Sequence, residues 1–155
     1  PLPSGEGPGV GLQTNTTNMA TTGTVLAKNM KIYVGSNAIT CQLSASLSCS
    51  TNMFQTTCKD SAANSAFLPG AKEWSIAGSA NFSFDATYGF EDLWDLWDAQ
   101  TAVTPIFQTA ITGDLKWSGS SYIEELNATS DGVDAAVEYD VTFRGTGALA
   151  KATVA

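Results

Sequence analysis

Histidine is absent from the 155 residues of this sequence. Its absence excludes Ser-His-Asp and Cys-His triads, histidine general bases and histidine-containing metal sites. Basic residues are also scarce: 7 lysines and arginines stand against 15 aspartates and glutamates, a net charge of −8. Because contacts to phosphate supply most of the affinity for nucleic acids, so few scattered cations argue against a nucleic-acid binder. They argue equally against docking on an anionic membrane.

Charge of either sign is low, at 14% of the residues against a usual value of about 25%. No apolar run approaches the ~18–20 residues of a membrane span, and the first residues lack the basic and apolar regions of a secretory signal. We therefore expect no membrane insertion. The three cysteines, Cys41, Cys49 and Cys58, are an odd number without a C-x-x-C pair. This favours three buried, reduced thiols in a reducing compartment over a disulfide framework.

What the sequence does contain is enough apolar material, 43% of the residues, for one domain with a real core. We place that domain at residues 24–155. Residues 1–23 form an arm in which prolines and glycines precede a Thr/Asn run. Such a segment has little to bury. It is either a disordered tail or a segment that becomes ordered against a partner subunit.

Period-two patterns dominate the first half of the domain. Residues 32–34 predict a short strand that a turn at 35–37 closes. Residues 39–50 predict a half-buried strand of about twelve residues, with no charge between Lys31 and Lys59. Soluble monomers avoid long, uncharged strands, because their edges invite association. The predicted inward side chains are Ile39, Cys41, Leu43, Ala45, Leu47 and Cys49; the predicted outward ones are Thr40, Gln42, Ser44, Ser46, Ser48 and Ser50.

Residues 51–71 interrupt this pattern and predict a long loop that carries large apolar side chains. Loops of this length in compact domains are commonly functional. A second alternation, from Trp74 to Phe84, predicts another half-buried strand. One helix is predicted at residues 89–100, because Phe90, Leu93, Trp94 and Trp97 recur at helical spacing opposite four acidic residues.

The second half predicts three further β features. Residues 103–111 form a strand that Pro105 assigns to an edge or a bulge. Residues 114–117 and 122–127 form a hairpin across residues 118–120, and residues 135–144 form the last strand, with Glu138 and Asp140 on its outer face. The expected fold class is mainly β: an antiparallel β-sandwich or partial barrel with one amphipathic α-helix.

Carboxylates are the remaining catalytic groups, and none forms a convincing site. Glu124 and Glu125 are adjacent, so a strand points them to opposite faces. Asp92 and Asp95 share a helix face, which is more typical of a solvated surface than of an acid–base pair. Trp117 lies beside a turn and leaves sugar stacking open. We expect no catalytic residue, cofactor or metal, which leaves a self-associating structural subunit or a small secreted or surface β-sandwich module that binds a carbohydrate or a protein.

Three stretches carry a resemblance to a known family. They are residues 67–78 (FLPGAKEWSIAG), residues 117–123 (WSGSSYI) and residues 141–149 (VTFRGTGAL). Their order and spacing resemble the major tail tube proteins of long-tailed, siphovirus-type bacteriophages. The resemblance covers most of residues 24–150 and leaves the arm outside.

This resemblance implies a virion tail protein, assembled in the host cytoplasm, whose hexameric rings join their sheets into one continuous β-barrel and stack around a tape-measure protein. Tail-terminator and tail-tip proteins are further implied partners, and viral DNA passes through without specific binding. The loop at 51–71 is expected to reach the next ring through Met53, Phe54, Lys59, Phe67 and Leu68. The candidates for the lumen are Gln42, Ser44, Ser46, Glu138 and Asp140, from the polar faces of the two clearest strands.

Overall fold

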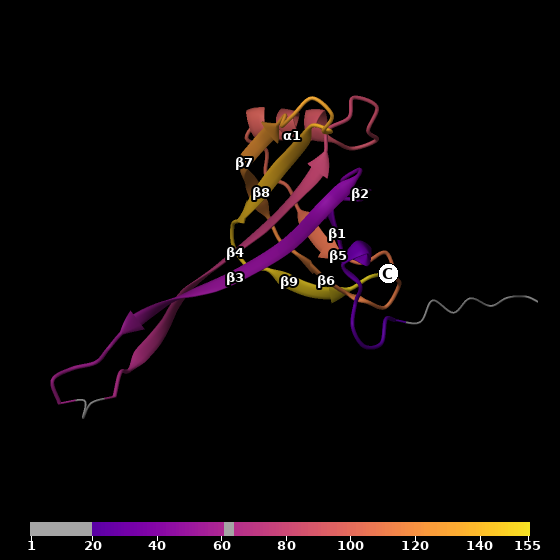
Figure 1. The fold of residues 1–155 in the computed structure, drawn as a ribbon. Helices are drawn as coiled ribbons and strands as arrows, with labels where there is room; N and C mark the ends of the chain where they lie inside the picture. The colour runs from indigo at the N-terminus through magenta and orange to yellow at the C-terminus, as the bar shows by residue number, and fades with distance from the viewer. Residues whose placement is uncertain (1–19, 61–63) are drawn as a thin grey trace, which may run out of the picture.

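Two antiparallel sheets and one α-helix make up the fold in a computed structural model, which describes residues 20–60 and 64–155 (Figure 1). The expected mainly β architecture is confirmed, and the sheets of the single chain do not close into a barrel. A 3₁₀ helix, η1 (Ala27–Asn29), precedes the strands, and the α-helix α1 (Phe90–Asp98) follows the fourth. The strands are β1 Lys31–Val34, β2 Asn37–Ala38, β3 Gln42–Gln55, β4 Phe67–Asn81, β5 Pro105–Gln108, β6 Leu115–Ser118, β7 Ser121–Thr129, β8 Glu138–Gly145 and β9 Ala150–Thr153.

The core lies between a four-stranded sheet of order β3-β4-β8-β7 and a five-stranded sheet of order β2-β1-β5-β6-β9. The predicted inward faces of β4 and β8 are confirmed, because alternate residues on both strands are buried. Leu93 of α1 joins this core. The central buried side chains are Ile32, Trp74, Ile76, Tyr139, Val141 and Phe143.

The three stretches that carry the family resemblance meet at the Trp74 indole. A Cβ on Gly145 would lie 2.1 Å from Trp74 Cε2, and one on Gly119 would lie 2.5 Å from Trp74 Cζ2. Both glycines therefore make room for the ring, and Trp74 Nε1 donates a hydrogen bond to the Gly147 carbonyl at 3.0 Å. The glycine-rich stretches thus form a slot for one tryptophan, which joins β4 to the ends of β6 and β8.

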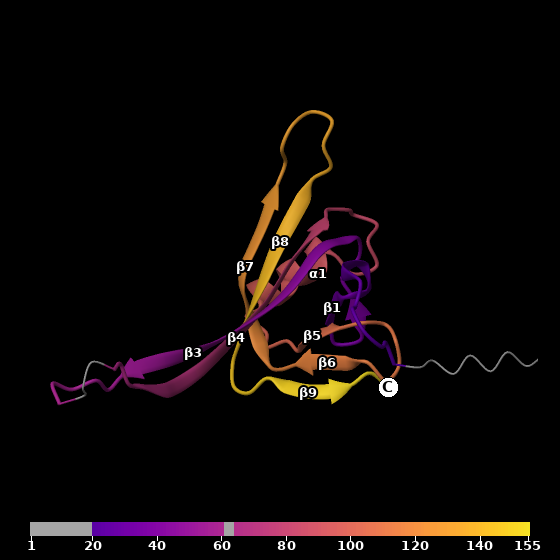
Figure 2. The ribbon, with the colours of Figure 1, turned by 60° about the horizontal axis from the view of Figure 1, so that its bottom comes forward.

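The predicted loop at residues 51–71 is largely wrong, because β3 continues to Gln55 and β4 begins at Phe67. Together they form a hairpin that extends well beyond the rest of the molecule (Figures 1 and 2). The predicted loop contains Pro69, which usually breaks a strand. It is accommodated because β8 pairs with β4 only from Ser75 onward, so this part of β4 has β3 as its sole strand neighbour among the described residues.

The predicted hairpin of residues 114–117 and 122–127 is also wrong, because its two strands belong to different sheets. β6 pairs with β5 and β9, whereas β7 pairs with β8. The turn at Gly119 packs against the Trp74 ring and connects the two sheets. The strand predicted at 103–111 is shortened to β5, and β9 follows the strand predicted to be last.

Several side chains predicted to be buried are exposed. All three cysteines are exposed, as are Leu43 and Phe84. A register irregularity between Gln42 and Ser44, next to Cys41 with its positive φ of 54°, interrupts the alternation at the start of β3. Inward alternation resumes with Ala45 and Leu47, which pack against the core.

Candidate assembly surfaces

The outer face of the four-stranded sheet is polar across all four strands. Ser44 Oγ and Ser79 Oγ lie 2.7 Å apart, and Ser46 Oγ donates to the Ala77 carbonyl at 3.1 Å. Ser79 is in register with Ser44 on one side and with Asp140 on the other. The fold thus brings together four of the predicted lumen residues on one face: Ser44, Ser46, Glu138 and Asp140.

Gln42 does not share this face, and the prediction that it does is wrong. Its Nε2 donates to the carbonyls of Ile32 at 2.7 Å and Ile39 at 3.1 Å, while its Oε1 accepts from the Ile32 amide at 2.9 Å. The irregularity before Ser44 turns Gln42 toward the five-stranded sheet. There it forms hydrogen bonds with backbone groups of β1 that would otherwise lack a partner. β1 is the neighbour of β2, the short edge strand of the five-stranded sheet.

The polar face carries more acid than the sequence predicted. Arg144 Nη2 lies 2.8 Å from Glu73 Oε2, and Arg144 Nη1 lies 3.8 Å from Glu124 Oε1, with all three side chains about half exposed. Exposed ion pairs of this kind contribute little stability. These ion pairs hold two carboxylates next to Arg144, which is the one arginine on this face among the described residues. Register alone identifies Glu73, which lies opposite Ser50.

The two edges of the four-stranded sheet are open. β3 and β7 each pair with one neighbouring strand among the described residues. At the start of β7, Ser121 exchanges two backbone hydrogen bonds of 2.8 Å with Val103 in an isolated bridge, and beyond it no further strand lies on this side in the described part of the chain. β3 is 14 residues long and β7 is 9. Unpaired strand edges of this length are templates for another strand.

The far end of the β3–β4 hairpin carries a cluster of exposed apolar side chains, which we call the hairpin cluster: Met53, Phe54, Phe67 and Leu68. They are between 54% and 63% exposed. Phe54 is in register with Leu68, and Gln55 with Phe67, so the cluster occupies both faces of the ladder. Lys59 lies beyond it, also exposed, near the hairpin tip. Apolar groups gathered on a protruding element mark an interaction site.

The helix α1 exposes aromatic side chains that its period assigned to the core. Trp94 is 47% exposed and Trp97 is 41% exposed, with their ring centroids 5.0 Å apart. Asp92 Oδ2 accepts from the Gly89 amide at 2.9 Å, which caps the helix start. Trp117 is half-buried, with its ring centroid 6.3 Å from that of Phe107.

Asp114 anchors the start of the described chain. Its carboxylate accepts hydrogen bonds from the Thr21 amide at 2.5 Å, the Thr21 hydroxyl at 2.7 Å and the Thr109 hydroxyl at 2.5 Å. These bonds, that from Thr109 first, hold the pKa of Asp114 below its usual range. Residues 20–23 of the predicted arm are thereby tied to the five-stranded sheet, while residues 1–19 lie outside the described residues.

Within residues 20–60 and 64–155, no three His, Cys, Asp or Glu side chains cluster so that they could hold a metal ion. In the same part of the chain, no helix has the length and apolar character needed to cross a membrane.

Comparisons with known proteins identify a family and a fold. The model of the phage tail tube protein family matches residues 35–151. No curated protein sequence matches the chain. A chain of the virion of a native gene transfer agent particle superposes with a TM-score of 0.69 at 16% identity, covering 85% of this chain and all of that one. A chain from the tail of an empty gene transfer agent particle with C6 symmetry gives 0.68 at 15% identity, covering 82% and 98%. The SPP1 tail tube gives 0.64 at 16% identity, covering 84% and 80%.

Proposed function

Because this chain belongs to the phage tail tube protein family and is a structural subunit of a virion tail tube, we propose that six copies join their four-stranded sheets into a ring. β3 and β7 run in opposite directions, since the four strands are antiparallel. Rotation about a ring axis therefore brings β7 of one copy antiparallel to β3 of the next. Six copies of four strands, 24 in all, form a closed sheet without free edges. Barrels of 16–18 strands already leave an aqueous channel, so one this large is open.

The polar face of the four-stranded sheet lines the bore in this ring. Its other face is covered by the five-stranded sheet and α1, so the face with Ser44, Ser46, Glu138 and Asp140 turns to the axis. The face is dominated by carboxylates and hydroxyls, and its one cation among the described residues, Arg144, is paired with Glu73 and Glu124, so a DNA polyanion finds little to bind. Screening over ~8 Å at physiological salt confines the repulsion to a layer near the wall, so DNA passes without adhering.

The hairpin cluster contacts the neighbouring ring. The β3–β4 hairpin projects beyond the body and carries Met53, Phe54, Phe67 and Leu68 with Lys59 near its tip. Stacked rings bury these apolar side chains, which gives the tube its axial strength. The stack encloses a tape-measure protein and ends on tail-terminator and tail-tip proteins. The subunit's role is structural, and we assign it no catalytic step.

The single observation that carries this proposal is a four-stranded sheet with two open edges, one covered face and one acidic, hydroxyl-rich face. Electron microscopy of the purified full chain tests it, with rings and tubes as the expected result. Phe67→Asp should leave the fold unchanged by circular dichroism and abolish stacking, since it charges an apolar contact. The matched control is Phe84→Asp, an exposed phenylalanine outside the hairpin, which should still stack. A chain that stays monomeric at high concentration contradicts the proposal.

A further inference from the structure

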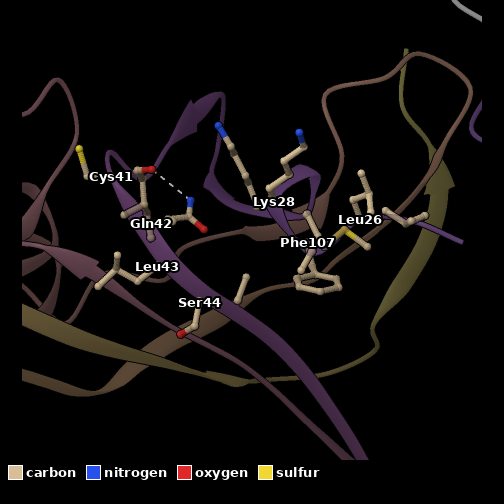
Figure 3. Close-up of a pocket in the computed structure, with 13 residues that line it drawn as sticks. Leu26, Lys28, Cys41, Gln42, Leu43, Ser44 and Phe107 are labelled. Atoms are coloured by element: carbon tan, nitrogen blue, oxygen red, sulfur yellow. Dashed lines mark hydrogen bonds between the residues drawn. The ribbon is translucent and has the colours of Figure 1, made fainter.

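A groove borders the open edge of β3. It lies between the start of β3, η1 and β5, and Figure 3 shows Leu26, Leu43 and Phe107 around it. Leu26 and Leu43 are more than half exposed, although both are apolar. Met30 also lines the groove. The groove therefore presents apolar surface next to an edge that offers unpaired backbone groups.

Two cations flank this groove. Lys28 and Lys31 line it, and both are exposed. Neither has a carboxylate within ion-pairing distance among residues 20–60 and 64–155. The chain has 7 basic residues, so two unpaired lysines at one apolar groove form a local positive site on an acidic protein.

The open edge of β7 is bordered by a surface of the opposite charge. A second hollow lies there between the end of α1 and β7, lined by Leu96, Trp97, Asp98 and Tyr122 among others. Trp97, which lines the hollow, is 41% exposed, and its ring neighbour Trp94 is 47% exposed. The solvent side of α1 carries Glu91, Asp95 and Asp98, none of which has a cationic partner in the described part of the chain. This surface is aromatic and negative.

We propose that α1 of one subunit docks, through Trp94 and Trp97, on the β3-edge groove of the adjacent subunit in the same ring. The inference rests on the proposed function, because pairing of β7 with the next copy's β3 is what brings the two surfaces together. Charge complementarity supports it, since the acids of α1 then face Lys28 and Lys31. So does the register: Ile123, which lines the hollow at β7, lies on the sheet row of Leu47, two residues along β3 from Ala45 beside the groove.

Sheet pairing alone would leave the outer layer of the ring discontinuous. The aromatic surface of α1 lies beside β7 and the groove lies beside β3, the two strands that pair between subunits in the proposed ring. Their contact closes the outer layer as β3–β7 pairing closes the inner one. Each interface then combines backbone hydrogen bonds with a buried aromatic anchor, which is the composition typical of energetically dominant contacts.

Disulfide trapping tests the contact, because Cys41 lines the groove and is exposed. The full chain carries Cys49→Ser, Cys58→Ser and Asp98→Cys, so that one cysteine lies in the groove and one on α1. Mild oxidation of assembled tubes joins two thiols with loss of two electrons to the oxidant. A denaturing gel without reductant should show a ladder that ends at six subunits. Adding Cys41→Ser should abolish the ladder.

The outcomes separate this inference from the function on which it rests. Tubes that form without any cross-link overturn the docking of α1 and leave the ring proposal intact. A ladder that continues beyond six subunits also overturns it, because the contact would then join rings. Absence of rings and tubes from the unmodified chain overturns both.

A charge exchange gives a second test without engineered cysteines. Lys28→Glu with Lys31→Glu should raise the protein concentration needed for ring assembly roughly tenfold at low salt, because like charges then meet across the seam. Adding Asp95→Lys and Asp98→Lys should restore assembly, since every seam contains both surfaces. Restoration that fails while circular dichroism stays native contradicts the contact. Glu138→Lys with Asp140→Lys, on the polar face, should not substitute for the exchange.

Discussion

The two halves of the β3–β4 hairpin differ in what covers them. In the proximal half of β4, Trp74 and Ile76 are buried beneath the five-stranded sheet. In the distal half, Phe67 and Leu68 on β4 and Phe54 on β3 are exposed, although they are as apolar as the residues of the core. Apolar content in a strand therefore does not by itself identify a core. It shows that the strand is to be covered, by the same chain in one half and, on our proposal, by another copy in the other.

The largest contrast is expected from one substitution in each region. Phe143→Ala removes a fully buried ring and should lower the free energy of unfolding by about 3–5 kcal/mol. Phe54→Ala removes an exposed ring and should change it by less than about 0.5 kcal/mol. Urea unfolding of unassembled protein measures both. Assembly should respond in the opposite order, with folded Phe54→Ala defective in stacking. Equal losses of stability would contradict the division of the hairpin.

The slot around Trp74 should respond to the addition of one methyl group. Gly145→Ala places a Cβ inside the indole and should cost about 1–3 kcal/mol in the free energy of unfolding. Combining it with Trp74→Phe should cost less than the sum of the two single changes, because the smaller ring relieves the overlap. Additive losses in this double-mutant cycle would show that the glycine does not make room for the tryptophan.

A smaller effect is expected where the arm meets the body. The pKa of Asp114 is lowered in the folded state, so its contribution to stability is present above the unfolded value of about 3.9. It should be lost as the pH falls through the lower folded value. The protection of the Thr21 amide against hydrogen exchange, relative to its intrinsic rate at each pH, should fall in that acidic range. Asp114→Asn should exchange faster at neutral pH and lose the acid dependence; unchanged exchange would contradict the anchor.

The smallest effect is expected at the Tyr139 hydroxyl, which is buried without a hydrogen-bond partner among the described residues. Burial raises its pKa to about 12. Its ordinary value is about 10, so the chain should lose stability as the pH rises from 10 toward 12, where the unfolded tyrosine ionises first. Tyr139→Phe should keep or slightly raise stability at neutral pH. It should also reduce the alkaline loss in thermal unfolding, and an unchanged alkaline profile would contradict this account.

The sequence predicted what depends on local periodicity. The inward faces of β4 and β8, the helix α1 and the mainly β fold class follow from alternation and helical spacing. The structure places Ser44, Ser46, Glu138 and Asp140 on one polar face, because each lies on a regular part of its strand, and the assignment of that face to the bore stays a prediction.

What depends on distant contacts could not be predicted. Gln42 faces inward because one irregularity in β3 reverses the alternation there. Trp94 and Trp97 have the spacing of core residues, yet residues 20–60 and 64–155 leave them 47% and 41% exposed. The hairpin predicted across residues 118–120 is wrong because sequence proximity does not reveal that Gly119 packs against Trp74 and that the strands on either side of it belong to different sheets.

Cryo-electron microscopy of tubes assembled from the purified full chain tests the central claim most directly. The account predicts β7 of each subunit hydrogen-bonded to β3 of the next, with Ser44, Ser46, Glu138 and Asp140 lining the bore. Rings in which the four-stranded sheet faces outward, or in which β3 and β7 stay unpaired, would contradict it.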